Sequence, residues 1–97
     1  MHNVVETEEF SDWIANLKDM PTRVRLVRRL GKARRGVLGD VKSVGEGVFE
    51  MREFFGPGWR MYYAESSNSL VVMLGGGDKS SQTKDIELAK KLSKDWI

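Results

Sequence analysis

The sequence predicts an α+β fold with two N-terminal helices, an antiparallel sheet and one C-terminal helix. In residues 8–34 the apolar side chains recur at helical spacing. Residues 41–74 instead form short apolar runs with two-residue alternation, separated by turn-forming stretches. Helical spacing returns after residue 82. Because 97 residues is the usual size of one domain, we expect residues 1–97 to fold as a single domain.

The N-terminal part predicts a short strand and two helices. Residues 3–6 form a candidate strand, and residues 8–18 are expected to be helical. One apolar stripe on that helix contains Phe10, Trp13, Ile14 and Leu17. Met20-Pro21 is expected to end it, and Thr22 to cap a second helix that reaches about Arg34.

Four strands and a last helix are expected after Gly36. The strands are residues 41–44, 48–55, 59–65 and 70–74. Their links (GEG, GPG and SSNS) are too short for parallel crossovers, so hairpins are expected. The strand 70–74 is apolar throughout and should be central. The final helix, residues 82–96, should turn inward Ile86, Ala89, Leu92 and Trp96.

The stretch LGGGDKSSQTKDI, residues 74–86, resembles a phosphate-binding loop at first sight. A P-loop needs the spacing GxxxxGK[ST], but Asp78 precedes Lys79 and Met73 occupies the position of the first glycine. We therefore expect no nucleotide site. The three glycines are expected to form a sharp turn after the strand, or to leave space for a ligand beside Lys79.

The charge is unevenly distributed. Residues 1–19 carry five acids and one base, whereas residues 20–36 carry seven bases and no acid. The predicted second helix gathers Arg25, Arg28, Arg29, Lys32 and Arg35 on one side. Either this is an ordinary solvated face, or its unbalanced repulsion indicates a polyanionic or acidic partner such as RNA.

The composition also argues against several classes of protein. The chain has no cysteine and one histidine, so neither disulfides nor a zinc site are expected. The sequence contains no run of about 18 apolar residues, so no membrane-spanning helix is expected. The acidic N-terminus lacks the pattern of a secretory signal peptide, and a cytoplasmic location is expected.

Charged side chains on the predicted strands are candidates for a site. Alternation places Glu50 and Arg52 on the face opposite the apolar residues of their strand, and Arg60 and Tyr62 on the corresponding face of the next strand. Lys42 and Lys79 are expected on the flanks of this group. Several cations bind a phosphate and stabilise charge that develops on it.

Roles for the other members of this group follow from their chemistry. Tyr62 is a candidate to stack on a base or to donate a proton. Glu50 is a candidate to accept a proton or to orient Arg52. The alternative is an ordinary salt-bridged sheet surface without a catalytic role.

Three segments in the same order resemble one known family. They are GDVKSVGEGVFEMR (39–52), GPGWRMYY (56–63) and LGGGDKSSQTKDI (74–86). Together they resemble the addiction-module killer proteins, the HigB-like branch of the RelE/ParE toxin superfamily. The similarity covers nearly the whole chain.

The resemblance implies a compact, mostly antiparallel sheet with two N-terminal helices and one C-terminal helix. It also implies a toxin of a type II toxin–antitoxin system that acts as a metal-independent endoribonuclease on mRNA in the ribosome, without a cofactor. Its inhibitor would be a cognate antitoxin, often a helix-turn-helix protein. The family's basic site falls here on Lys42, Arg52, Arg60 and Lys79.

The general base is left open by the resemblance. Relatives use a histidine, a glutamate or a C-terminal tyrosine, but here the only histidine is His2 and no tyrosine follows Lys79. Glu50, Asp40 and a lysine are the candidates. Two other functions stay open: a toxin of the same fold that inhibits a protein such as DNA gyrase, as ParE does, and a non-toxic module that binds RNA or protein.

Overall fold

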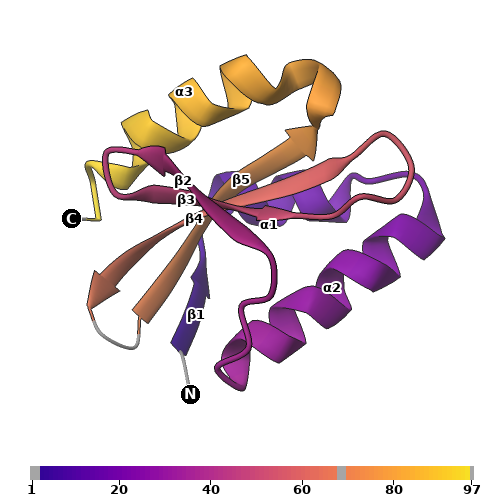
Figure 1. Ribbon diagram of the computed structural model, residues 1–97, viewed down its shortest axis with the longest axis horizontal. Helices are drawn as coiled ribbons and strands as arrows, with labels where there is room; N and C mark the ends of the chain where they lie inside the picture. The colour runs from indigo at the N-terminus through magenta and orange to yellow at the C-terminus, as the bar shows by residue number, and fades with distance from the viewer. Residues whose placement is uncertain (1–2, 68–69, 97) are drawn as a thin grey trace.

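The computed structural model describes residues 3–67 and 70–96 and has the α+β architecture that the sequence predicts (Figure 1). Its helices are α1 (Glu8–Ala15), α2 (Met20–Arg34) and α3 (Gln82–Ser93), with a short 3₁₀ turn, η1 (Lys79–Ser81), before α3. Its strands are β1 (Asn3–Glu6), β2 (Val41–Gly45), β3 (Val48–Arg52), β4 (Trp59–Ser67) and β5 (Leu70–Asp78). Within these residues no helix is long and apolar enough to cross a membrane.

The strands form one sheet in the order β1-β5-β4-β3-β2. Strands β2 to β5 are an antiparallel meander, as the short links predict, and β1 pairs in parallel with β5. The expectation that the most apolar strand is central is confirmed, because β5 lies between β1 and β4. The parallel pairing joins Asn3 to Leu70, so two segments far apart in the sequence are neighbours in one sheet.

Helices cover both faces of the sheet. On one face, here called the α1/α2 face, the core contains Phe10, Ile14, Leu26, Leu30, Met51, Met61, Tyr63 and Met73. On the other, the α3 face, a smaller core contains Val48, Tyr62, Ala64, Val72, Leu74 and Ala89. Burying these side chains contributes most of the folding free energy.

Several predicted boundaries are wrong. Asp19, rather than Thr22, caps α2: its carboxylate accepts from the Thr22 N–H, and Pro21 lies in the first turn, where a missing N–H costs nothing. Strand β3 ends at Arg52 instead of residue 55. Helix α3 ends at Ser93, and Trp96, predicted to point inward, is exposed.

The three glycines do not form a turn, which is the main correction to the predicted fold. They continue β5, where Gly75, Gly76 and Gly77 pair with Tyr62, Met61 and Arg60 of β4. A Cβ on Gly76 would lie 2.4 Å from the ring of Trp13, and one on Gly77 would lie 2.0 Å from Oδ2 of Asp85. These two glycines therefore let side chains from α1 and α3 lie directly on the strand.

Candidate anion-binding site on the α3 face

The sheet register brings most of the predicted site residues together. Lys42, Glu50 and Tyr62 are successive cross-strand neighbours in one row across β2, β3 and β4. Arg52 and Arg60 face each other in the next row. Directly opposite residues point to the same face, so all five side chains belong to the α3 face. The prediction that Glu50, Arg52, Arg60 and Tyr62 share one face is confirmed.

Arg52 is held by Asp40, which precedes β2. Its Nη2 donates to Oδ1 of Asp40 at 2.9 Å, and its backbone N–H donates to the Asp40 carbonyl. The hydrogen bond with Asp40 raises the pKa of the Arg52 guanidinium above its already high value. Arg52 is therefore a fixed positive charge, and Asp40, a candidate base in the sequence, is engaged as its partner.

Glu50 is paired with Arg60 rather than with Arg52. Its carboxylate is 3% exposed, lies 3.8 Å from Nε of Arg60, and accepts a hydrogen bond of 3.1 Å from the side-chain amide of Gln82. The expectation that Glu50 orients Arg52 is therefore wrong. Gln82, at the start of α3, is a site residue that the sequence analysis missed, because nothing local connects it to a strand 32 residues away.

Tyr62 is fully buried beneath α3. Burial, and then the nearby Glu50, raise the pKa of its phenol, so the hydroxyl keeps its proton at neutral pH. In this conformation the ring cannot stack on a base, contrary to one of the two roles expected for it. The hydroxyl is equally enclosed, so it does not reach a substrate directly in this conformation either.

Three buried polar atoms at the site have no hydrogen-bond partner in the described part of the chain. They are Nε of Arg52, Nε of Arg60 and the hydroxyl of Tyr62. Buried polar groups are normally satisfied, and exceptions gather where a ligand or water completes the network. The three atoms come from adjacent strands on the same face, so this part of the sheet has unused capacity to donate hydrogen bonds.

Phe54 lies beside the two guanidinium groups. Its ring centroid is 5.6 Å from Cζ of Arg52 and 5.9 Å from Cζ of Arg60, and the side chain is 70% exposed. An exposed aromatic ring next to cations is the usual platform for a nucleobase. Phe54 lies two residues beyond Arg52, where β3 ends.

The two lysines expected on the flanks are exposed. Lys42 lies opposite Glu50 on β2, at the sheet edge. Lys79 begins η1, and a Cβ on Gly58 would lie 3.4 Å from Nη1 of Arg60 and 3.6 Å from Cβ of Lys79. Lys79 and Arg60 thus flank one glycine. Asp78 caps the turn by accepting from Ser80, and this hydrogen bond lowers the pKa of Asp78.

The second predicted basic group, on α2, is only partly exposed to solvent. Arg25, Arg28, Lys32 and Arg35 are exposed, and Arg25 lies over the ring of Phe55 at 3.8 Å. Arg29 is 8% exposed, so its assignment to an RNA-binding surface is corrected. It turns inward because it lies on the boundary between the apolar and basic sides of the helix.

Arg29 has a positioning role instead. It donates to the carbonyls of Leu38, Asp40 and Arg52 and forms an ion pair of 3.2 Å with Glu53. Gly39, at φ +74°, packs against its guanidinium, where a Cβ would approach to 3.0 Å. Arg29 therefore fixes the backbone that presents both members of the Asp40–Arg52 pair.

The arrangement has the chemistry to bind an anion. Arg52 and Arg60 supply fixed charges, and the exposed lysines add charge at the rim. Helix α3 begins beside Glu50, and the N-terminus of a helix adds a favourable potential for an anion. Glu50 and Asp40 are the carboxylates paired with these two arginines. No group of acidic, histidine or cysteine side chains in the described residues could hold a metal ion.

Comparison with known proteins gives one clear relative. A protein of Haemophilus influenzae strain Rd, described as uncharacterized, is 39% identical over 89 residues, which covers 92% of this chain and 90% of the relative. The two proteins belong to one family. No described protein family matches the chain.

Proposed function

We propose that the chain is a cytoplasmic toxin of a type II toxin–antitoxin system that cleaves mRNA on the ribosome. The observation that carries this proposal is the cross-strand pair Arg52–Arg60, beside exposed Phe54 and buried Glu50. Fixed cations next to a stacking platform suit a ribonucleotide, which has a phosphate and a base. The resemblance to HigB-like toxins of the RelE/ParE superfamily supports the same reading.

In this proposal the reaction needs neither metal nor cofactor. The ribosome and the cation cluster hold the RNA so that its 2′-hydroxyl lies in line with the adjacent phosphorus. Arg60 and Lys79 stabilise the charge that develops on the phosphate, with Arg52 and Lys42 beside them. Glu50 orients Arg60. One water molecule accepts the proton of the 2′-hydroxyl and another delivers a proton to the departing 5′-oxygen, because Tyr62 is fully buried.

Primer extension on mRNA in translating ribosomes tests this proposal. Wild-type protein is compared with Arg60→Ala, with Lys79→Ala and with Lys91→Ala, a matched charge change on the exposed side of α3. Loss of one charge-stabilising donor costs about 10²–10³ in rate, so cleavage should fall by that factor in the first two variants only. Lys79 is exposed, so its variant stays folded even if the Arg60 variant does not.

Absence of cleavage by a folded wild-type protein that arrests growth would overturn the ribonuclease proposal. Arrest that persists in Arg60→Ala and Lys79→Ala would then indicate a protein target such as gyrase. Expression without any arrest would favour a non-toxic binding module.

We also propose that the exposed face of α2 binds the antitoxin. Met20, Val24 and Val27 form an exposed apolar stripe at spacings of four and three residues, with Arg28 and Lys32 on one side. Valine and methionine do not stack on bases, whereas an amphipathic helix with acidic flanks complements both the stripe and the cations. This favours a protein over ribosomal RNA at α2.

Replacing both valines of this stripe tests the antitoxin surface. Val24→Ser with Val27→Ser should weaken antitoxin binding, measured by calorimetry with the neighbouring gene's product, and leave cleavage unchanged. The same pair of changes should reduce ribosome-dependent cleavage if α2 instead contacts ribosomal RNA.

A further inference from the structure

Strand β5 has one edge that no other strand covers. Strand β4 pairs with β5 as far as Asp78, but β1 pairs with it only from Leu70 to Met73. Thr7 extends this contact by one residue, through hydrogen bonds to the carbonyls of Met73 and Leu74. Beyond Leu74, no strand in the described part of the chain lies on the β1 side of β5.

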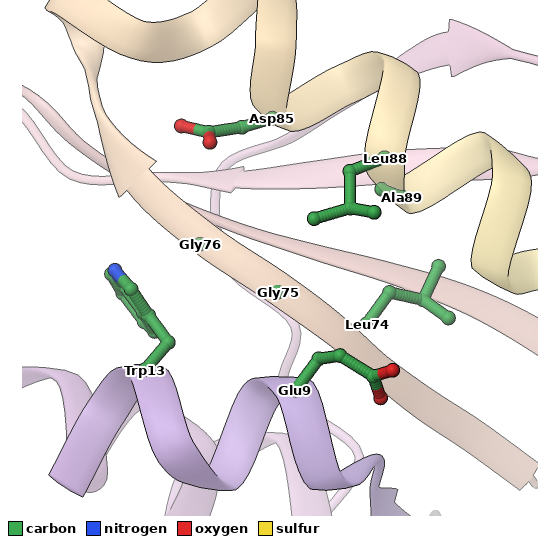
Figure 2. Close-up of a pocket in the computed structure, with 8 residues that line it drawn as sticks. All are labelled: Glu9, Trp13, Leu74, Gly75, Gly76, Asp85, Leu88 and Ala89. Carbon is green, nitrogen blue, oxygen red and sulfur yellow. The ribbon is translucent and has the colours of Figure 1, made fainter. Parts of the chain in front are cut away.

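A cleft of about 220 Å³ lies along this open edge, between α1 and α3 (Figure 2). Its floor is the backbone of Gly75 and Gly76. Figure 2 shows Trp13 and Glu9 rising from α1 on one side, and Asp85 and Leu88 from α3 on the other. Leu88 is 50% exposed, so the cleft has an apolar wall as well as two carboxylates.

Gly75 is the one residue of the glycine run that packing does not explain. A Cβ there would meet no atom within 4 Å, whereas Trp13 and Asp85 occupy the space beside Gly76 and Gly77. Glycine within a strand costs about 0.5–1 kcal/mol relative to alanine. The chain therefore keeps open space at Gly75, on the floor of the cleft.

We propose that this cleft binds an extended, basic segment of a partner protein, which adds to the sheet as a new strand beside β5. Free strand edges bind peptides in this way: backbone hydrogen bonds give affinity, and pockets for alternate side chains give specificity. The open edge from Gly75 to Asp78 accommodates about four residues, or roughly 13 Å of extended chain.

The negative charge of the cleft favours a basic peptide as its ligand. Glu9 and Asp85 line the cleft, and exposed Glu8 and Asp12 lie nearby on α1. A nucleic acid strand would be repelled by these carboxylates. A second copy of the chain is also disfavoured, because edge-to-edge pairing would bring two such acidic sets together. Lysine or arginine side chains on the segment complement Glu9 and Asp85, and an apolar side chain fits between Trp13 and Leu88.

The proposal is independent of any catalytic role of the chain. The proposed RNA-binding cations Lys42, Arg52 and Arg60 lie on β2, β3 and β4, whereas Glu9 and Asp85 line the cleft at β5. The two surfaces adjoin where Gly75 pairs with Tyr62.

Titration of the isotope-labelled full chain with a defined peptide tests this inference by NMR. The probe is a blocked hexapeptide of alternating valine and lysine, and its counterpart has glutamate in place of lysine. The basic probe should shift the amide signals of Gly75–Asp78 and the indole signal of Trp13, and slow hydrogen exchange at the strand edge. The acidic probe should cause no shift there.

Two variants and a control make the test specific. At Gly75 an added Cβ meets no atom within 4 Å, so Gly75→Val should fold but bind the probe at least tenfold more weakly. Glu9→Lys should transfer the preference from the basic to the acidic probe. Glu87→Lys, the same charge change at an exposed position of α3 outside the cleft, should change neither.

The inference is overturned if the basic peptide shifts no signal of β5 at millimolar concentration. It is equally overturned if the shifts persist in a folded Gly75→Val protein, or if both peptides bind equally well to the wild type.

Discussion

On the α1/α2 face of the sheet, large apolar side chains such as Phe10, Leu26 and Tyr63 fill the interface. On the α3 face, the apolar contacts stop at Tyr62, and the next row of the sheet carries Arg52 and Arg60. The same strands therefore support two kinds of surface. One is committed to stability, whereas the other leaves polar atoms unsatisfied and exposes a phenylalanine, as expected where a ligand completes the structure.

The largest effect should come from the centre of the α1/α2 face. Phe10 is fully buried among side chains of α2 and the sheet, so Phe10→Ala should lower the free energy of unfolding by about 3–5 kcal/mol. Urea denaturation followed by circular dichroism measures it. A loss below 1 kcal/mol would show that the α1/α2 face is not the main core.

Adjacent glycines give a matched comparison of the two faces. Gly76→Ala places a methyl group against the ring of Trp13 and should cost about 1–3 kcal/mol. Gly75→Ala meets open space and should change the unfolding free energy by less than about 1 kcal/mol. Thermal unfolding measures the stability of both variants. An equal loss of stability in the two would contradict the packing described for Gly75 and Gly76.

The hydroxyl of Tyr62 should reduce stability. It is buried without a hydrogen-bond partner among the described residues, so Tyr62→Phe should raise the free energy of unfolding by about 1 kcal/mol. Because the buried hydroxyl does not reach the substrate, cleavage should change little in the same variant. Chemical denaturation and primer extension on one preparation measure both. A loss of stability would indicate that water satisfies the hydroxyl.

At alkaline pH, Tyr62 should contribute more than Tyr63 to the loss of stability. Burial raises the pKa of Tyr63 to about 12 and raises that of Tyr62 further, from a usual value near 10. The native state holds these protons more tightly than the unfolded state. Their contribution is therefore complete below pH 10 and is lost as the pH rises through the folded pKa values. Tyr62→Phe should reduce this alkaline loss more than Tyr63→Phe, measured as unfolding free energy against pH.

The smallest change in stability is expected at the rim of the site. Lys79 is exposed and makes no ion pair with another described residue, so Lys79→Ala should change the unfolding free energy by no more than about 0.5 kcal/mol. If the α3 face carries the chemistry, cleavage should nevertheless fall by about 10²-fold. A destabilised variant would mean that Lys79 serves the fold instead.

The architecture was predictable because its signals are local. Helical and strand periodicities, and links too short for crossovers, gave the order of elements and the antiparallel meander. Alternation also placed Glu50, Arg52, Arg60 and Tyr62 on one face. All of this depends on residues near one another in the sequence.

The errors depend on contacts between distant residues. Three glycines usually indicate a turn, and only Trp13 and Asp85, far away in the sequence, reveal why they lie in a strand. Arg29 looked like one more cation of the α2 face, because its carbonyl acceptors lie on a loop and a strand that helical periodicity does not describe. The pairing of Glu50 with Arg60 required the strand register.

The parallel contact of β1 with β5 has a consequence for synthesis. Asn3 and Leu70 are neighbours in the sheet but 67 positions apart in the chain, and contacts at such separation form slowly. A nascent chain that has β1, α1 and α2 outside the ribosome lacks the strand on which these elements pack. The segment from β1 to α2 therefore remains incompletely folded until β5 emerges, and the site is assembled only after the start of α3 has been made.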